Sequence, residues 1–165
     1  MRVVAAVLVI LAATAQAPAP APAAAAYCAM VPLRSDCEPL TVGAPHASLK
    51  LAVVATDAAR ERGLMFVPSV PVGQGMLFAF SGGDQSRSFW MKNTITPLDM
   101  VWVRADGTVT TVAARVPKTR PGTPDERVAT RVGEGTYVIE LRAGDAERAG
   151  IVPGTTLALP NLPAE

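Results

Sequence analysis

The sequence predicts a small, mostly β domain, a sandwich or partly open barrel of six to seven short strands with one or two short helices. Three observations support this fold class. Apolar and polar residues alternate in several short segments, which is the pattern of half-buried strands. Fifteen prolines and thirteen glycines divide the 165 residues into short elements. No alternation of strands with helices is visible, so an α/β fold is disfavoured.

The first 17 residues resemble a secretory signal peptide. Arg2 gives a positive start, residues 3–13 are apolar throughout, and residues 15–17, Ala-Gln-Ala, fit a signal peptidase site. The apolar run is too short to span a bilayer, which takes about 20 residues. We therefore expect a periplasmic or secreted chain without stable membrane insertion, cleaved after Ala17 or further along. An uncleaved anchor is the alternative.

Residues 18–46 are rich in Ala and Pro and are expected to form a linker. They contain Cys28 and Cys37, the two cysteines of the chain. Because exported proteins meet an oxidising compartment, we expect a disulfide between them. Two oxidised cysteines and the single histidine, His46, cannot supply three zinc ligands. The sequence therefore predicts no metal site and no cofactor.

The β-rich domain is expected over residues 47–160. Residues 47–56 alternate in polarity and predict its first strand, after which Thr56 or Asp57 can cap a short helix that ends at Gly63. Further strands are expected at residues 75–80, 87–93, 98–105, 108–116, 136–144 and 155–160, and one or two helical turns at 144–151.

Two connections stand out between these elements. Asp106-Gly107 is the strongest turn signal, since this pair tolerates the positive φ angles of a two-residue hairpin. Residues 116–135 carry three prolines and three glycines and predict a long exposed loop. Loops of this length in a small domain are often functional.

The segment SFWMKNTITPLDM, residues 88–100, joins bulky apolar residues to a polar cluster. If Phe89 and Met91 point into the core, Trp90 and Lys92 share the opposite face. A hairpin-like return would bring Asp99 beside Lys92. One interpretation is therefore structural: an ion pair between Lys92 and Asp99, with Asn93 and Thr94 capping the turn.

The other interpretation is a ligand site. Trp90 offers a stacking face, Lys92 a cation, and the polar neighbours direct hydrogen bonds, a combination that suits a sugar or another small polar or anionic solute. The candidate ligand-binding residues are Trp90, Lys92, Asn93, Thr94, Asp99, Glu140 and Arg62. We expect a monomeric, non-enzymatic binding or accessory module. A nucleic-acid partner is not expected, because the net charge is +1 and no basic stripe is visible.

Two alternative functions stay open. An extracytoplasmic hydrolytic enzyme could use Lys92, Asp99 or Glu140, although His46 lies before the domain and a Ser-His-Asp triad lacks a base. Soft-metal binding is the second alternative, because thioethers select Cu(I) and methionines cluster in the motif region. These methionines are Met65, Met76, Met91 and Met100. Methionine also commonly fills gaps in a core, so convergence of three sulfurs on one point would be needed.

Several motifs together resemble the domain-of-unknown-function 192 family. They are RERGLM, GMLFAF, FWMKNT followed by PLDM, IELRAG and AGIVPG, and they occur in the family's order and spacing from about residue 49 to 159. The resemblance implies a compact, β-rich, often secreted domain of bacteria and archaea with no established activity. The Pro-rich loop at 117–127 departs from the commoner family pattern, and the leader and both cysteines lie outside the resemblance.

Overall fold

The computed structural model describes residues 39–159. Its strands are β1 (Leu40–Ala44), β2 (Ala47–Val54), β3 (Gln74–Ala79), β4 (Gln85–Trp90), β5 (Leu98–Val103), β6 (Val109–Val116), β7 (Thr130–Gly135) and β8 (Tyr137–Arg142). The helices are α2 (Asp57–Arg62) and α3 (Asp145–Arg148), with a 3₁₀ turn, η1 (Asp125–Arg127). No helix within the described residues is long and apolar enough to cross a membrane.

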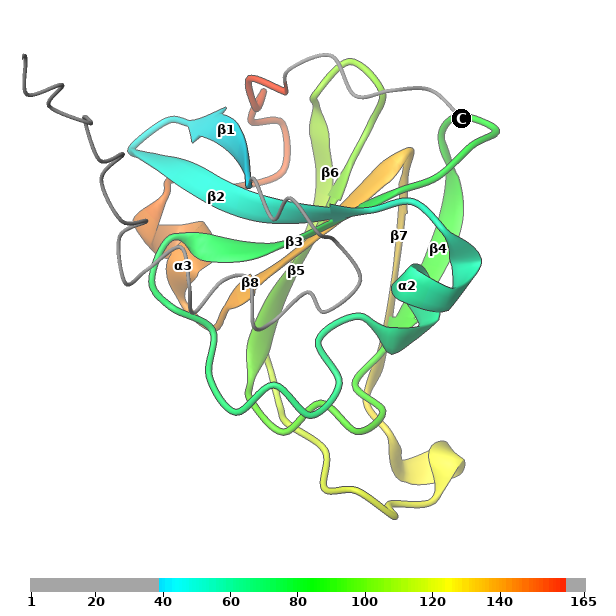
Figure 1. Ribbon diagram of the computed structural model, residues 1–165. Helices are drawn as coiled ribbons and strands as arrows, with labels where there is room; N and C mark the ends of the chain where they lie inside the picture. The colour runs from blue at the N-terminus through cyan, green and yellow to red at the C-terminus, as the bar shows by residue number, and fades with distance from the viewer. Residues whose placement is uncertain (1–38, 160–165) are drawn as a thin grey trace, which may run out of the picture.

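The strands form two sheets, as Figure 1 shows. The larger sheet has the order β1-β2-β3-β8-β5-β6, and the smaller sheet pairs β4 with β7. The larger sheet is open rather than closed into a barrel. The predicted mostly β fold with short strands and short helices is confirmed, with eight strands in place of six or seven.

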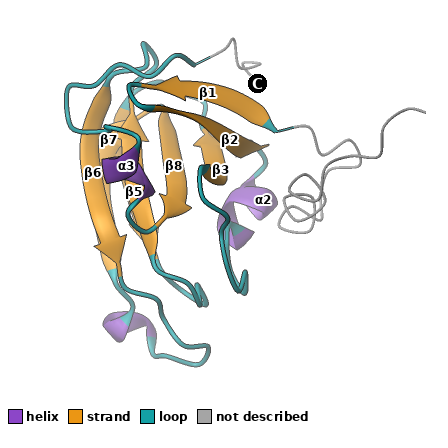
Figure 2. Ribbon diagram, turned by 90° about the vertical axis from the view of Figure 1, so that its left-hand side faces the viewer, coloured by secondary structure: helices purple, strands orange, loops and turns teal. Residues whose placement is uncertain are grey.

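The large sheet separates two apolar cores. Side chains alternate between its faces along each strand, so Val138 on β8 enters one core while Ile139 and Leu141 enter the other. Ala59 of α2 packs into the first core, and Ala146 of α3 packs into the second. The two helices therefore cover opposite faces of the sheet, as the side view indicates (Figure 2).

One βαβ unit lies inside this β-rich fold. β2 and β3 pair in parallel, and α2 forms the crossover between them. The Thr56 hydroxyl caps α2 by accepting a hydrogen bond from the Ala59 N–H at 3.4 Å, and Gly63 ends the helix with a φ of 44°. The capping prediction is confirmed, but the expectation of no strand–helix alternation is wrong for this unit.

Three strand predictions differ from the structure. β1 lies before residue 47, so the folded domain includes part of the predicted linker. Residues 155–159, the described part of the predicted last strand, do not form a strand and make only isolated bridges, such as Thr108 with Thr156. β7 lies within the segment predicted to be a long loop. Its glycines resemble loop residues, but Gly133 allows close packing, since a Cβ there would approach the Trp102 side chain to 2.5 Å. The predicted leader and the disulfide between Cys28 and Cys37 lie outside the described residues.

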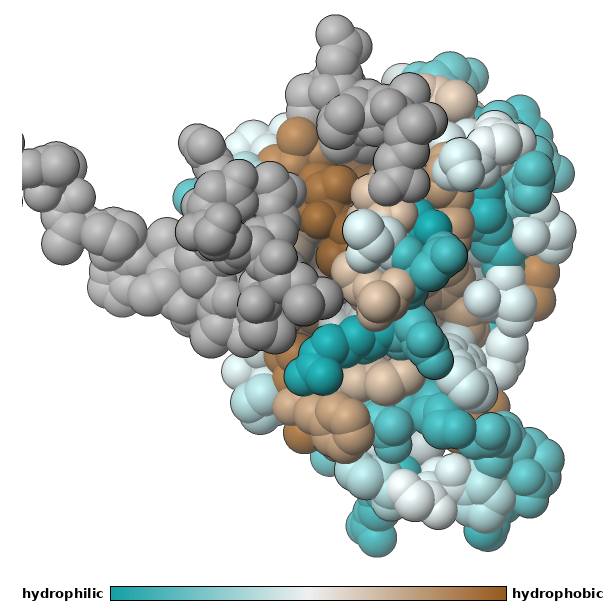
Figure 3. Space-filling model, turned by 45° about the vertical axis from the view of Figure 1, so that its right-hand side comes forward, coloured by the Kyte–Doolittle hydropathy of each residue, from teal (hydrophilic) through white to brown (hydrophobic). Residues whose placement is uncertain are grey.

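Three loops meet at the lower end of the molecule in Figure 1. They are residues 63–73 after α2, residues 91–97 after β4, and residues 117–129, which contain η1. The last of these loops is largely hydrophilic at the surface, as the lower part of Figure 3 shows. These loops form one end of the candidate site.

Candidate functional site

A solvent-open cleft lies between α2 and the end of β4. We call it the outer cleft; its volume is about 510 Å³, and it is lined by Ala58, Glu61, Arg62, Met65, Trp90, Lys92 and Asn93. Beneath it lies an inner recess of about 30 Å³, lined by Arg60, Glu61, Arg62, Gly63, Leu64, Met65, Phe78, Phe89, Trp90, Lys92, Thr94 and Glu140. Five residues line both spaces, so the recess adjoins the cleft. The recess has room for one or two water molecules or a single small functional group.

Glu140 lies in the inner recess with its side chain only 5% exposed. Met76 of β3 and Met100 of β5 pair with Glu140 in register, so its carboxyl group leaves the sheet between two thioether side chains. Within residues 39–159 this carboxyl group takes part in no hydrogen bond and no ion pair. Burial alone raises the pKa of Glu140 from 4.5 to about 8. Glu140 is therefore mostly a neutral acid at pH 7.

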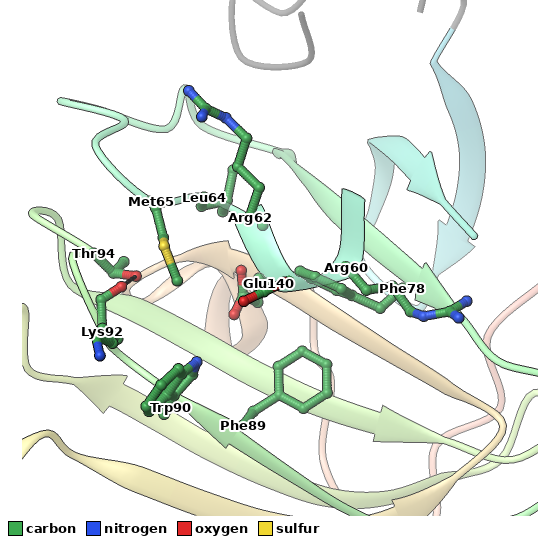
Figure 4. A pocket seen from close by; sticks show the side chains of 12 residues that line it. Arg60, Arg62, Leu64, Met65, Phe78, Phe89, Trp90, Lys92, Thr94 and Glu140 are labelled. Carbon is green, nitrogen blue, oxygen red and sulfur yellow. Dashed lines mark hydrogen bonds between the residues drawn. The ribbon is translucent and has the colours of Figure 1, made fainter. Parts of the chain in front are cut away.

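Aromatic rings form the apolar wall of the recess. Phe78 and Phe89 pack edge to face with ring centroids 4.9 Å apart, and Phe89 meets Trp102 in the same manner at 6.1 Å. In Figure 4, Glu140 points into the space between these phenylalanine rings, Trp90 and Met65, while the guanidinium groups of Arg60 and Arg62 point away. The nonpolar walls explain the desolvation of the acid.

Trp90 and Lys92 form the polar edge of the outer cleft. Trp90 is 40% exposed, and the Lys92 ammonium lies 4.9 Å from its ring centroid, within cation–π range. Lys92 Nζ also contacts both carboxylate oxygens of Asp125, at 2.7 and 3.0 Å. The predicted ion pair between Lys92 and Asp99 is therefore wrong. The chain does not return as a hairpin, because β4 pairs with β7 while β5 pairs with β6 and β8.

Residues 92–94 hold the three loops together. The Asn93 carbonyl accepts a hydrogen bond from the Phe66 N–H at 2.9 Å, and the Thr94 carbonyl accepts one from the Thr119 N–H at 2.8 Å. The Thr94 hydroxyl donates to the Lys92 carbonyl at 3.2 Å and closes the turn. Asn93 adopts a φ of 53°, a left-handed conformation that asparagine tolerates. The predicted capping of the turn is confirmed for the Thr94 side chain, whereas the Asn93 amide contacts Met65 Sδ at 3.8 Å. Both residues also line the site.

Asp99 lies away from both spaces and is fully buried. One carboxylate oxygen accepts a hydrogen bond from the Arg115 N–H at 2.7 Å, and the other accepts from the N–H groups of Gly144 and Ala146, both at 2.9 Å. The first bond fills a register shift between β5 and β6, and the others hold the start of α3. Asp99 was predicted to contact a ligand, but its oxygens already serve the fold.

The remaining predicted residues divide between the site and the core. Arg62 lies exposed at the end of α2 and lines both spaces. Met76, Met91 and Met100 belong to the apolar core on the α2 side, and only Met65 lines the cleft. Across residues 39–159, no group of three or more His, Cys, Asp or Glu side chains is placed to hold a metal ion.

Three charged residues of the site were not predicted: Arg60, Glu61 and Asp125. Arg60 lines the inner recess, although its guanidinium group points away. Glu61, which lines both spaces, carries no local signal that separates it from the solvated face of α2. Asp125 lies 33 residues from Lys92 in the sequence, inside the segment predicted as a loop. Only the three-dimensional pairing identifies its role.

The comparisons with known proteins place the chain in a family. The model of the DUF192 family, described as "Uncharacterized ACR, COG1430", matches residues 40–159. No curated protein matches this chain. A crystal structure from Sinorhizobium meliloti 1021, named a "putative transcription regulator", is 30% identical, with 73% of this chain and 91% of that chain covered and a TM-score of 0.61.

A second crystal structure, of a protein of unknown function from Novosphingobium aromaticivorans DSM 12444, is 29% identical. The match covers 72% of this chain and 82% of that chain, with a TM-score of 0.59. The family match spans most of the chain and includes every element of the candidate site. The chain is a member of the DUF192 family.

Proposed function

We propose that this domain is an exported binding module that holds a small polar ligand in the outer cleft and takes one functional group of it into the inner recess. The observation that carries the proposal is Glu140, a buried acid at the end of an accessible cleft that forms no hydrogen bond or ion pair with any residue from 39 to 159. A ligand group in the recess would supply the missing partner.

The chemistry of the recess restricts the inserted group. Glu140 is protonated at neutral pH, so it can donate a hydrogen bond to an oxygen and also accept one. A space of about 30 Å³ admits a hydroxyl or a carbonyl oxygen but no ring. The outer cleft, at about 510 Å³, has room for a monosaccharide, and exposed Trp90 offers a face on which a sugar ring could stack. A sugar or sugar-like polyol fits these requirements.

Hydrolysis is a second candidate function, because a carboxyl group with a pKa of about 8 is suited to general acid catalysis. Glycoside hydrolysis usually takes two carboxyl groups that flank the scissile bond. Asp99 is engaged by three backbone N–H groups, so the second carboxyl group would have to be Glu61, which lines the same recess. The binding proposal needs only the buried acid and is therefore preferred.

Copper binding and gene regulation receive less support. Met76 and Met100 flank Glu140, but neither lines the recess, so a metal ion there would not meet their sulfurs directly. The name of the Sinorhizobium protein points to transcription. The formal net charge of +1 does not favour nucleic-acid binding, in which attraction to phosphates is a dominant contribution.

Ligand titration followed by amide NMR tests the proposal. The probes are D-glucose, N-acetyl-D-glucosamine and D-glucuronate, added to the mature chain and to the Glu140→Met and Glu126→Gln variants. At least one probe should shift the Trp90 indole signal and the amides of residues 91–94 in the wild type. Glu140→Met, which keeps a similar length but can neither donate nor accept a strong hydrogen bond, should weaken that binding about tenfold. Glu126→Gln, which replaces an exposed acid outside both spaces, should leave it unchanged. Absence of cleft shifts with all three probes would contradict the proposal.

A further inference from the structure

We propose that the ligand of the outer cleft is a carboxylate of monosaccharide size, and that Asp125 occupies on Lys92 the position that the ligand carboxylate takes. This inference rests on the proposed function and specifies the class of ligand. A hydroxy acid of the sugar-acid type has the required groups, a carboxylate for Lys92 and hydroxyls for the recess. Asp125 thereby becomes a residue that sets affinity and specificity.

The contact between Lys92 and Asp125 shows where a carboxylate binds. Both oxygens of Asp125 lie within 3.0 Å of Lys92 Nζ, which itself lies over the ring of Trp90 at 4.9 Å. A carboxylate at this position is therefore beside the exposed aromatic face and at the edge of the cleft. Thr94, two residues after Lys92, lines the same recess as Glu140. One small molecule can reach the ammonium group and the recess together.

The ion pair between Lys92 and Asp125 is exposed enough for a ligand carboxylate to replace Asp125. The side chain of Asp125 is 60% exposed and that of Lys92 is 34% exposed. Ion pairs in such surroundings change an equilibrium constant by no more than about fivefold. A ligand carboxylate that also stacks on Trp90 and fills the recess gains contacts that Asp125 does not make. It can therefore displace Asp125 with little loss.

The charges around the outer cleft favour an anion once Asp125 is displaced. Arg62 and Lys92 contribute two positive charges to its lining, and Glu61 contributes one negative charge. Glu140 adds no charge below pH 7, because its pKa is about 8. Arg62 forms no ion pair with any residue of the described part, and its long exposed side chain can turn toward a ligand. A neutral sugar would use none of these charges.

Isothermal titration with D-glucuronate and D-glucose, which differ at C6, tests the inference. The wild type should prefer glucuronate. Asp125→Asn should tighten glucuronate binding by up to about fivefold and leave glucose unchanged, since it removes a competing anion. Lys92→Met should weaken glucuronate binding by about fivefold and leave glucose binding unchanged. Glu126→Gln, a neighbouring exposed acid whose loss alters the net charge equally, is the matched control and should change neither affinity.

A double variant separates competition from a general charge effect. In Lys92→Met, adding Asp125→Asn should no longer tighten glucuronate binding, because the site of competition is absent. Equal gains from Asp125→Asn and Glu126→Gln would overturn the inference, as would wild-type binding of glucose as tight as that of glucuronate. The last result would leave the proposed function intact. Cleft binding of neither compound would count against both.

Discussion

Two buried acids on neighbouring strands, Asp99 and Glu140, have opposite environments. Asp99 on β5 pairs in register with Leu141, and the next residue, Met100, pairs with Glu140 on β8. Because side chains alternate between sheet faces, this step of one residue sends Asp99 toward α3 and Glu140 toward the cleft. Asp99 accepts three hydrogen bonds from backbone N–H groups, whereas Glu140 accepts none within the described residues.

The difference shows that hydrogen-bond partners, rather than burial, distinguish an acid that stabilises the fold from an acid of a candidate site. Both acids are at least 95% buried. The fold uses the oxygens of Asp99 to join a strand bulge to the start of α3. It surrounds Glu140 with apolar side chains and leaves a recess beside it. A stabilising role therefore explains Asp99 and does not explain Glu140.

Replacing Asp99 should have the largest effect on stability. Asp99→Ala leaves three N–H groups, those of Arg115, Gly144 and Ala146, without their acceptor, and should lower the free energy of unfolding by about 4 kcal/mol or more. Asp99→Asn, which keeps one oxygen, should lose less. Urea unfolding measures both values, with Glu126→Ala as the exposed control. A loss below about 1 kcal/mol for Asp99→Ala would show that the contrast between the two acids is wrong.

Replacing Glu140 should raise the free energy of unfolding, whereas replacing Asp99 should lower it. The raised pKa means that the folded state holds its proton up to about pH 8, while the unfolded state releases it above about pH 4.5. Ionisation of this acid therefore destabilises the folded state at high pH. The free energy of unfolding falls by up to about 1.4 kcal/mol per pH unit as pH rises from about 4.5 to about 8. Glu140→Gln cannot ionise, so at pH 8 its free energy of unfolding should exceed that of the wild type by about 4 kcal/mol.

Unfolding at several pH values checks this prediction. The difference between Glu140→Gln and the wild type should grow from pH 5 to pH 8 and then level off. A constant difference over that range would mean that Glu140 titrates normally. A more stable Glu140→Gln variant, combined with loss of ligand binding in Glu140→Met, would be the pattern expected of a residue kept for function at the expense of stability.

Local sequence patterns predicted the elements that depend on local chemistry. The alternation in β8 and the capping of α2 by Thr56 and Gly63 follow from the residues themselves. Long-range pairing did not follow. β4 pairs with β7, beyond two intervening strands, although consecutive strands pair about two-thirds of the time. The glycines of β7 resembled loop residues because the close contact of Gly133 with Trp102 is a tertiary feature.

The residues of the candidate site also divide into those that the sequence predicted and those that depend on long-range pairing. Trp90, Lys92 and Glu140 lie at the cleft and recess where the sequence predicted a ligand site. Asp99 was assigned to it only through an expected hairpin return, which the pairing of β5 with β8 replaces. Asp125 could not be identified, because its partner lies on a different loop and its own neighbours carry no distinguishing pattern.

Lys92 is a third charged residue to compare with the two acids, and its replacement should have the smallest effect on stability. Its ion pair with Asp125 is exposed, so Lys92→Met should change the free energy of unfolding by less than about 1 kcal/mol, close to the result for exposed Lys50→Met. Urea unfolding measures this value. A loss of several kcal/mol would assign Lys92 to the architecture, beside Asp99. A small change, together with weaker binding of glucuronate, would group Lys92 with Glu140, because neither charge would then be needed to hold the fold.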